Sequence, residues 1–356
     1  MTGPIDCDVH PTLPSMATLM PYLPRYWREV FTARGLDRMD YQLTADPRST
    51  PLHARPDWRA DGGPAKDVAT LQRHLLDPFG LGHAILNCMH AGMLMFSEDM
   101  AAVVCRAVNE WLAREWLDRD PRLRAAITVP LGGVELAVAE IERCAADPRF
   151  VQVLVPVSHE APLGRRQFWP IWRAAEQHGL PVAIHAGSAY RQAPTATGWP
   201  STFIEDHVAE SQAFESAVLS LLAEGVFEAC PRLTVVLAES GVAWMPGFLW
   251  RANKMWRGVR TEVPWLKREP AETIRRHVRL TMQPLDLPED AARFARFRAQ
   301  LNADEMLLFA SDYPHHHFEG QAALGSAIPE ELRRRIGVDN PLATYPRLAV
   351  AQGVAA

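Results

Sequence analysis

The sequence predicts an α/β protein of the (β/α)8 TIM-barrel class, in which eight parallel strands are surrounded by helices. Short apolar, β-branched segments alternate with segments of helical spacing from about residue 65 onward. Several of the apolar segments are nearly continuous, which is typical of a parallel sheet covered on its outer face. The 356 residues are 48% hydrophobic and 22% charged, a balance that permits a large core and excludes global disorder.

Eight strands are expected, and most of them are followed by a segment of helical spacing. The strands are expected at residues 5–10, 83–87, 123–130, 150–157, 182–185, 233–238, 278–282 and 306–310. The helices are expected at residues 66–76, 100–117, 134–146, 167–178, 208–224, 243–256 and 289–301. An open, doubly wound sheet is the alternative, but it usually has a glycine-rich first turn, whereas strand one here ends in Asp8-Val9-His10-Pro11.

Residues 11–64 interrupt this alternation directly after strand one. The stretch is rich in Pro and also carries Gly, Ser and Asp, and it has no sustained apolar period. We therefore expect an insertion that lies over the barrel mouth, within a single domain of residues 1–356.

Charge and cysteine content exclude several classes of protein. The formal net charge of −5 provides no basic field for nucleic acid or an anionic membrane. No run of 18 apolar residues occurs, and the N-terminus lacks the layout of a secretory signal. Five cysteines without a CxxC pair suit a reducing compartment, so we expect a cytoplasmic protein.

Four metal-binding side chains follow the expected strands at their carboxyl ends, where barrel enzymes place their active sites. Asp8 and His10 are two residues apart on strand one and therefore point to the same side. His185 ends strand five and Asp312 follows strand eight. A lone histidine there is more often structural, and an aspartate often caps the next helix. Four such donors at one rim favour a catalytic divalent metal with an open coordination position.

Four motifs resemble the amidohydrolase superfamily, specifically its amidohydrolase-2 branch, which is related to aminocarboxymuconate semialdehyde decarboxylase. They are IDCDVHP at 5–11, VAIHAG at 182–187, AESG at 238–241 and FASDYPH at 309–315. The resemblance implies a barrel with one divalent ion, commonly zinc. It also implies that the ion is held by Asp8, His10, His185 and Asp312.

Two positions depart from that family pattern. Asp8 stands where most relatives have histidine, and its carboxylate makes manganese possible beside zinc. Glu239 stands where the better-known decarboxylases have a histidine at the end of strand six. We expect Glu239 and Asp312 to transfer protons, although a simple salt bridge between Glu239 and an arginine is the alternative. Superfamily members with two metals usually carry a lysine on strand four, and residues 150–157 contain none, so one metal is expected.

A small-molecule substrate is expected at the same rim. His315 and His90 lie at strand ends where each can hydrogen-bond a substrate, and Arg191 can pair with a substrate carboxylate. The loop after strand five offers three residues for an apolar wall: Tyr190, Trp199 and Phe203. Relatives are often dimers, and a homodimer is possible here as well.

Two reactions fit a single metal beside an acid–base pair. Hydrolysis of an amide, ester or lactone bond of a small carboxylated or aromatic substrate is the preferred prediction, because the strand-six histidine of the decarboxylases is missing. Non-oxidative decarboxylation of an aromatic or muconate-type acid is the alternative, and the carboxylate of Asp8 favours it. A catalytically silent barrel that only binds a ligand is a third possibility, which metal analysis would test.

Overall fold

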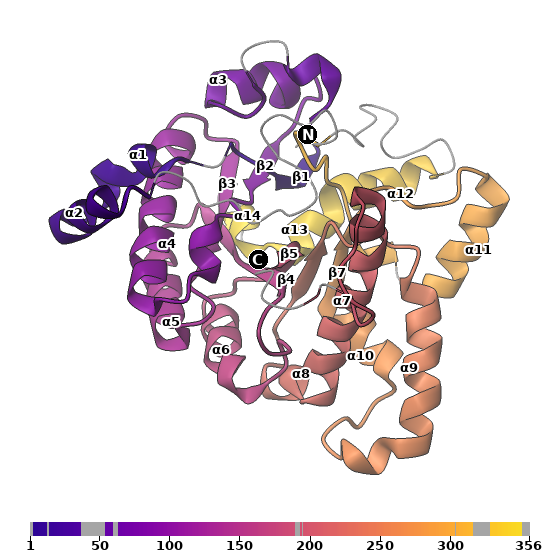
Figure 1. The fold of residues 1–356 in the computed structure, drawn as a ribbon. Helices are drawn as coiled ribbons and strands as arrows, with labels where there is room; N and C mark the ends of the chain where they lie inside the picture. Colours follow the sequence, from indigo (N-terminus) through magenta and orange to yellow (C-terminus); the bar gives the residue numbers. More distant parts are fainter. Residues whose placement is uncertain are drawn as a thin grey trace.

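Eight parallel strands form one sheet in the order β1-β2-β3-β4-β5-β6-β7-β8 in a computed structural model of the chain (Figure 1). The structure describes residues 3–12, 14–36, 54–59, 63–188, 193, 195–302, 304–315 and 328–350. The strands are β1 (Ile5–Val9), β2 (His83–Leu86), β3 (Leu123–Thr128), β4 (Phe150–Ser158), β5 (Val182–Ser188), β6 (Val235–Ala238), β7 (Val278–Thr281) and β8 (Leu307–Leu308). Each overlaps a segment that the apolar pattern predicts, and β4 and β5 extend one and three residues beyond their predicted ends.

The sheet closes between β1 and the segment that follows β8. The backbone N–H of Cys7 donates to the carbonyl of Phe309 at 3.0 Å. Farther along, the N–H of Asp312 donates to the carbonyl of Asp8 at 3.0 Å. The N–H of His10 donates to the carbonyl of Tyr313 at 2.7 Å. These bonds join the first and last strands, so the predicted (β/α)8 barrel is confirmed.

Helices surround the barrel and are most easily described in chain order. They are α1 (Met16–Leu19), α2 (Arg25–Arg34), α3 (Val68–Leu71), α4 (Glu98–Leu112), α5 (Val134–Cys144), α6 (Trp169–Gln177), α7 (Phe203–Ala223), α8 (Val226–Ala229), α9 (Met245–Val259), α10 (Pro270–His277), α11 (Ala291–Leu301), α12 (Glu330–Arg334), α13 (Asn340–Thr344) and α14 (Pro346–Val350). Helix α7 begins five residues before its predicted start because Thr202 and Glu205 form a capping box. Helix α10 escaped prediction because it is short and polar, with three basic residues in its last turn.

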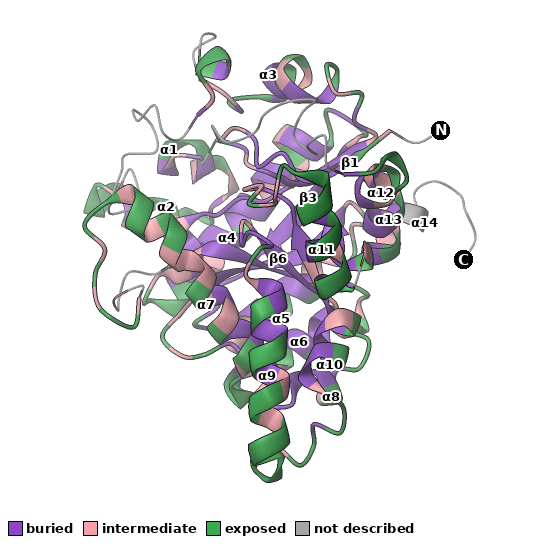
Figure 2. Cartoon of the chain, turned by 90° about the vertical axis from the view of Figure 1, so that its right-hand side faces the viewer, coloured by how far each residue is buried: buried purple, intermediate pink, exposed green. Residues whose placement is uncertain are grey.

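Apolar side chains fill the barrel interior away from the carboxyl ends of the strands, and polar residues occupy the carboxyl ends. Six of them come from strands: Ile5, Cys7, Ile85, Val151, Val236 and Leu308. Tyr345 and Leu348 of the C-terminal segment join the same cluster. Figure 2 shows the buried strands inside a shell of half-exposed helices. Because this floor is apolar, the polar chemistry is confined to the carboxyl ends of the strands.

The described parts of the predicted insertion contact two regions. The Tyr22 hydroxyl donates to Glu115 at 3.0 Å, beside the end of α4. Farther along, the N–H of Arg55 donates to the carbonyl of Pro314 at 3.1 Å, and the Trp58 ring lies 4.6 Å from that of Tyr313. Residues 37–53 and 60–62 lie outside the described residues, so the position of the whole insertion over the mouth stays a prediction.

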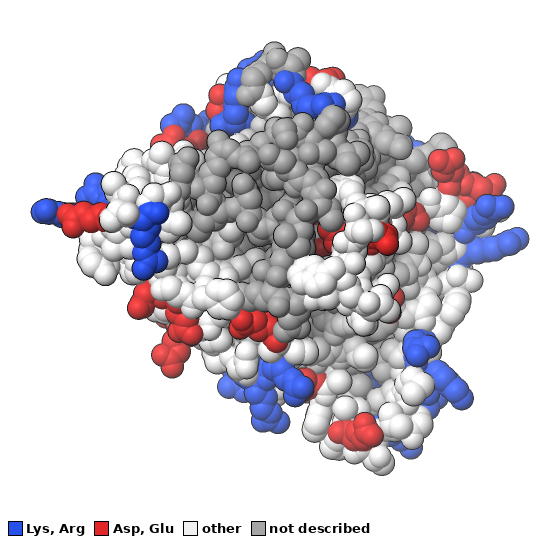
Figure 3. Space-filling view, viewed as in Figure 1, with Lys and Arg blue, Asp and Glu red and all other residues white. Residues whose placement is uncertain are grey.

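The surface and the helix lengths bear on possible partners. On the face drawn in Figure 3, the described basic and acidic side chains alternate around the periphery. Within the described residues, no helix combines the length and the hydropathy needed to span a bilayer.

Candidate active site

Asp8 is a fully buried carboxylate at the end of β1. Its Oδ1 accepts a hydrogen bond from the Asn87 amide at 2.8 Å, and Gln152 in turn donates to Asn87 at 2.8 Å. Its Oδ2 accepts no hydrogen bond from any residue that the structure describes. A buried carboxylate oxygen without a donor is destabilising unless a cation neutralises it. Asp8 is therefore suited to hold a positive ion.

His10 and His185 present the same nitrogen atom to each other. Nδ1 of His10 lies 3.0 Å from the carbonyl of Asn87, and Nδ1 of His185 lies 2.8 Å from the carbonyl of Ala186. Carbonyls only accept hydrogen bonds, so both Nδ1 atoms carry a proton. Nε2 of each ring then faces the site, and the two Nε2 atoms are 3.3 Å apart. This is how histidines that bind a metal are oriented.

Asp312, which follows β8, brings a second buried carboxylate to the same place. Its Oδ1 lies 3.0 Å from Nε2 of His10. Nδ1 of His315 donates to the same oxygen at 2.7 Å. Asp312 has a φ of 52°, a left-handed conformation that is rare for a residue with a side chain. Such strain persists where surrounding contacts enforce it, and it is common at functional sites.

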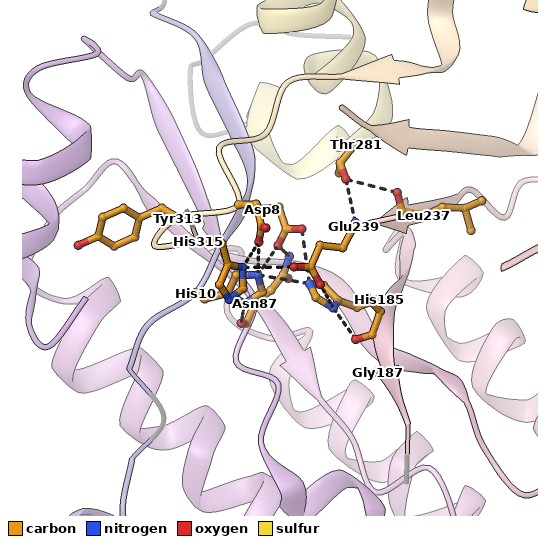
Figure 4. A network of polar contacts seen from close by, with 12 residues as sticks. Asp8, His10, Asn87, His185, Gly187, Leu237, Glu239, Thr281, Tyr313 and His315 are labelled. Atoms are coloured by element: carbon orange, nitrogen blue, oxygen red, sulfur yellow. Dashed lines mark hydrogen bonds and ion pairs between the residues drawn. The ribbon is translucent and has the colours of Figure 1, made fainter. Parts of the chain in front are cut away.

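Glu239 lies between His185 and His315 (Figure 4). Its Oε1 is 3.2 Å from Nδ1 of His315, and its Oε2 is 3.7 Å from Nδ1 of His185. Its φ of 61° is also left-handed, and its N–H donates to the Thr281 hydroxyl at 3.2 Å. Among the described residues, the ion-pair partners of Glu239 are thus two histidines of the site rather than an arginine.

The electrostatics of these groups favour a positive charge at the rim. Burial alone would raise the pKa of Asp8, but the imidazoles of His185 and His10 outweigh it and lower that pKa. Burial alone would lower the pKa of His185, but Asp8 outweighs it and raises that pKa to about 10. The pKa of His315 is raised well above its usual range, because Asp312 and Glu239 outweigh its burial. Surroundings that hold a proton this firmly also stabilise a metal cation.

The donor atoms form two overlapping groups that share His10. Asp8, His10 and His185 bring ligand atoms within 4.8 Å of one another. His10, Asp312, Glu239 and His315 do the same. The structure therefore brings the four predicted ligands together at one rim, with Asp312 joined to the others through His10. Two imidazoles and two carboxylates fit a divalent ion.

The remaining predicted residues have different surroundings. His90 is buried, and its Nδ1 accepts the N–H of Gly92 at 3.0 Å. Burial lowers the pKa of His90 to about 4, and the backbone of Pro14 bonds its ring as well. We therefore leave His90 out of the proposed substrate site. Arg191 lies outside the described residues, as does Tyr190. Trp199 is half-exposed, and its role as a substrate wall stays a prediction.

Comparison with known proteins places this site in a family. A family model described as Amidohydrolase (Amidohydro_2) matches residues 5–347. The chain belongs to the amidohydrolase family. The match runs from β1 to α14 and includes all four motifs, so the resemblance found in the sequence is confirmed.

The chain is similar to curated decarboxylases, and several of the solved structures that it resembles are decarboxylases as well. A gamma-resorcylate decarboxylase of Rhizobium radiobacter is 25% identical over 295 residues, which cover 77% of this chain and 86% of that protein. One from Polaromonas sp. is 23% identical over 302 residues, 80% and 89% of the two chains. The crystal structure of 5-carboxyvanillate decarboxylase from Sphingomonas paucimobilis aligns with a TM-score of 0.70 at 21% identity. It covers 97% of this chain and 99% of that chain.

These relatives overturn the preferred prediction that the enzyme hydrolyses an amide, ester or lactone bond. The curated relatives are gamma-resorcylate decarboxylases, so the hydrolase prediction is wrong. Its reasoning relied on Glu239 standing in place of a histidine. That reasoning failed because a carboxylate and an imidazole can both hold or move a proton, so the residue type does not select the reaction.

Glu210, on α7, has contacts to the site that sequence reasoning missed. Its Oε1 accepts the backbone N–H of Gly187 at 2.7 Å, two residues after His185. Burial and the neighbouring carboxylate of Glu239 raise the pKa of Glu210 to about 8. No motif marks this residue in the sequence, because it lies in the interior of a long helix.

Proposed function

We propose that the chain is a divalent-metal-dependent, non-oxidative decarboxylase of a small hydroxylated aromatic acid. The observation that carries the proposal is the meeting of His10 and His185, through Nε2, with the buried carboxylates of Asp8 and Asp312. The named relatives act on gamma-resorcylate, which is 2,6-dihydroxybenzoate, and on 5-carboxyvanillate, and both are aromatic carboxylic acids. The site geometry supports a metal-dependent reaction, and the relatives support decarboxylation as that reaction.

Asp8, His10, His185 and Asp312 are the residues proposed to hold the ion. When bound, a divalent ion would supply the positive charge that anchors the substrate carboxylate and a neighbouring oxygen. Two carboxylates among the four ligands favour a hard ion, and a dihydroxybenzoate decarboxylase from Polaromonas was solved with bound manganese. Manganese is therefore the first ion to test and zinc the second.

Asp312, His315 and Glu239 are proposed to manage the proton that decarboxylation requires. The ring carbon bearing the carboxylate takes a proton from Asp312, and the electron pair of the broken carbon–carbon bond returns to the ring as carbon dioxide leaves. His315 resupplies Asp312 through their 2.7 Å hydrogen bond. Glu239, 3.2 Å from the same ring nitrogen, holds the His315 imidazole charged and in place.

A product assay tests this proposal. The protein is stripped of metal, reloaded with manganese or zinc, and incubated with 2,6-dihydroxybenzoate, 5-carboxyvanillate and related hydroxybenzoates. We expect the corresponding phenol and carbon dioxide in equal amounts, measured by HPLC and gas analysis, from the loaded protein alone. Asp312→Asn serves as the inactive control. Metal-independent turnover, or cleavage of esters and lactones without carbon dioxide, would contradict the proposal.

A further inference from the structure

We propose that Glu210 is a positioning residue that aims His185 at the metal through the peptide unit between Ala186 and Gly187. The inference rests on the proposed metal site, and it concerns a helix residue that is not one of the proposed metal ligands. It explains why an acidic side chain from the middle of α7 reaches the end of β5.

A single peptide unit carries both contacts. Its carbonyl, on Ala186, accepts the Nδ1 proton of His185 at 2.8 Å. Its N–H, on Gly187, donates to Oε1 of Glu210 at 2.7 Å. The peptide is planar, so fixing the direction of the N–H also fixes the direction of the carbonyl. Glu210 thereby sets the acceptor that keeps the proton on Nδ1 of His185 and leaves Nε2 available.

The backbone at this point needs such an anchor. Gly187 has a φ of 134°, in the region that favours glycine, so no side chain restricts the rotation of the peptide. Residues 182–185 pair with both neighbouring strands, whereas the ladder with β6 ends at His185. The contact with α7 therefore restrains the peptide where pairing with β6 has stopped.

A competing acceptor shows what the anchor prevents. Oε2 of Glu239 lies 3.7 Å from Nδ1 of His185. If the Ala186 carbonyl turned away, this nitrogen would take Glu239 as its acceptor, and the imidazole would rotate. Glu239 would then bond less well to His315, whose Nδ1 is 3.2 Å from its other oxygen. Glu210 thus supports the orientation of a metal ligand and, through it, the partner of His315.

Helix α7 places Glu210 by its own sequence. Thr202 and Glu205 fix the first turn through the capping box, and Glu210 follows Phe203 by about two turns. Glu215 lies on the same helix but interacts electrostatically with Arg251 on α9 instead. Glu215 is therefore a matched control for the loss of an acidic side chain from α7.

The test measures Mn²⁺ binding to the metal-free protein by electron paramagnetic resonance. We expect Glu210→Ala to weaken binding by roughly 10- to 100-fold, as for other residues that orient metal ligands. Glu210→Gln keeps an acceptor oxygen and should bind within about threefold of the parent protein, whereas Glu215→Ala should leave binding unchanged. Nitrogen-15 NMR of the His185 ring should show a changed Nδ1 signal in Glu210→Ala alone, because Nδ1 then donates to Glu239 rather than to the Ala186 carbonyl.

Each outcome decides the inference. If the parent protein binds no Mn²⁺, the proposed metal site itself fails. If the parent binds and Glu210→Ala binds equally well with an unchanged His185 Nδ1 signal, the metal site stands and the positioning role is wrong. Should Glu210→Ala not fold, Glu210→Asp removes one methylene from the reach of the side chain, and unweakened binding by that folded variant overturns the inference.

Discussion

The two sides of the proposed metal site are held in different ways. On the β1/β8 side, Asp8 and Asp312 are fully buried and lie on segments joined by backbone hydrogen bonds. On the β5/β6 side, His185 and Glu239 depend on side chains of other elements, Glu210 of α7 and Thr281 of β7. The β1/β8 side is therefore built by the backbone hydrogen bonds that close the barrel. The β5/β6 side is supported by side chains of α7 and β7, which lie outside the sequence motifs of the site.

Asp6 stabilises the backbone of the β1/β8 side, two residues before Asp8 on β1. Its Oδ1 accepts the N–H of Asp8 at 3.2 Å and the N–H of Ser311 at 3.0 Å. Asp6 is fully buried, and burial raises its pKa to about 7. One carboxyl group thus ties the backbone beside both carboxylates of the site. This side should resist perturbation unless Asp6 itself is changed.

Removal of one imidazole from each side gives the largest expected effect. His10→Ala and His185→Ala should each weaken Mn²⁺ binding by more than about 100-fold, because a ligand is lost rather than its support. Binding is measured by isothermal titration of the metal-free proteins. Circular dichroism should show both variants folded. If His185→Ala kept full affinity and activity, the assignment of His185 to the metal site would be wrong.

Asp6→Ala is the next largest perturbation and acts on the β1/β8 side. Two buried backbone N–H groups lose their acceptor, so the free energy of unfolding should fall by about 2–4 kcal/mol. Urea denaturation of the metal-free protein measures it. Asp6→Asn keeps an acceptor oxygen and should lose far less. An equal loss in both variants would show that charge, rather than hydrogen bonding, is what Asp6 contributes.

Glu239→Gln perturbs the β5/β6 side by removing a charge. Because Asp312 and Glu239 together raise the pKa of His315, loss of one carboxylate should lower that pKa. As the pH is raised, the His315 imidazole would then lose its proton at a lower pH than in the parent protein. NMR titration of His315 in the metal-free protein measures the shift. An unchanged pKa would mean that Asp312 alone holds the proton.

Thr281→Val gives the smallest expected effect. The variant keeps the shape of a fully buried side chain but removes the hydroxyl that accepts the N–H of Glu239. We expect a loss of about 1 kcal/mol in the free energy of unfolding and a change in kcat without loss of Mn²⁺ binding. Thermal denaturation and steady-state kinetics measure these two quantities. A loss of metal binding would extend the role of Thr281 to His185.

The same division between the two sides explains what could be predicted from the sequence. Asp8, His10 and Asp312 were found because they lie directly at strand ends, where a barrel gathers its polar groups. His185 was found for the same reason on β5. Glu210 was not, because a helix interior carries no local signal of what its side chain contacts in space. Asp6 was hidden too, since a buried aspartate in an apolar strand has no pattern of its own.

The fold was more predictable than the helices around it. Apolar runs mark strands that are covered on both sides, so all eight were located. Helix α10 and the short helices of residues 330–350 were missed because their few residues show no clear apolar period. The reaction was the least predictable property. The same metal and acid–base groups serve both hydrolysis and decarboxylation, so the proposal of decarboxylation rests on the curated relatives.

Strand β8 contains only two residues, Leu307 and Leu308, and the bonds that complete the cylinder continue through Phe309, Asp312 and Tyr313. The β1–β8 joint, that is, the set of backbone hydrogen bonds that closes the barrel, is therefore also part of the proposed catalytic rim. A transient parting of this joint would inactivate the enzyme while most of the molecule stayed native. Heat inactivation should accordingly begin at lower temperature than bulk melting, and a bound ion that grips both edges of the joint should bring the two temperatures together.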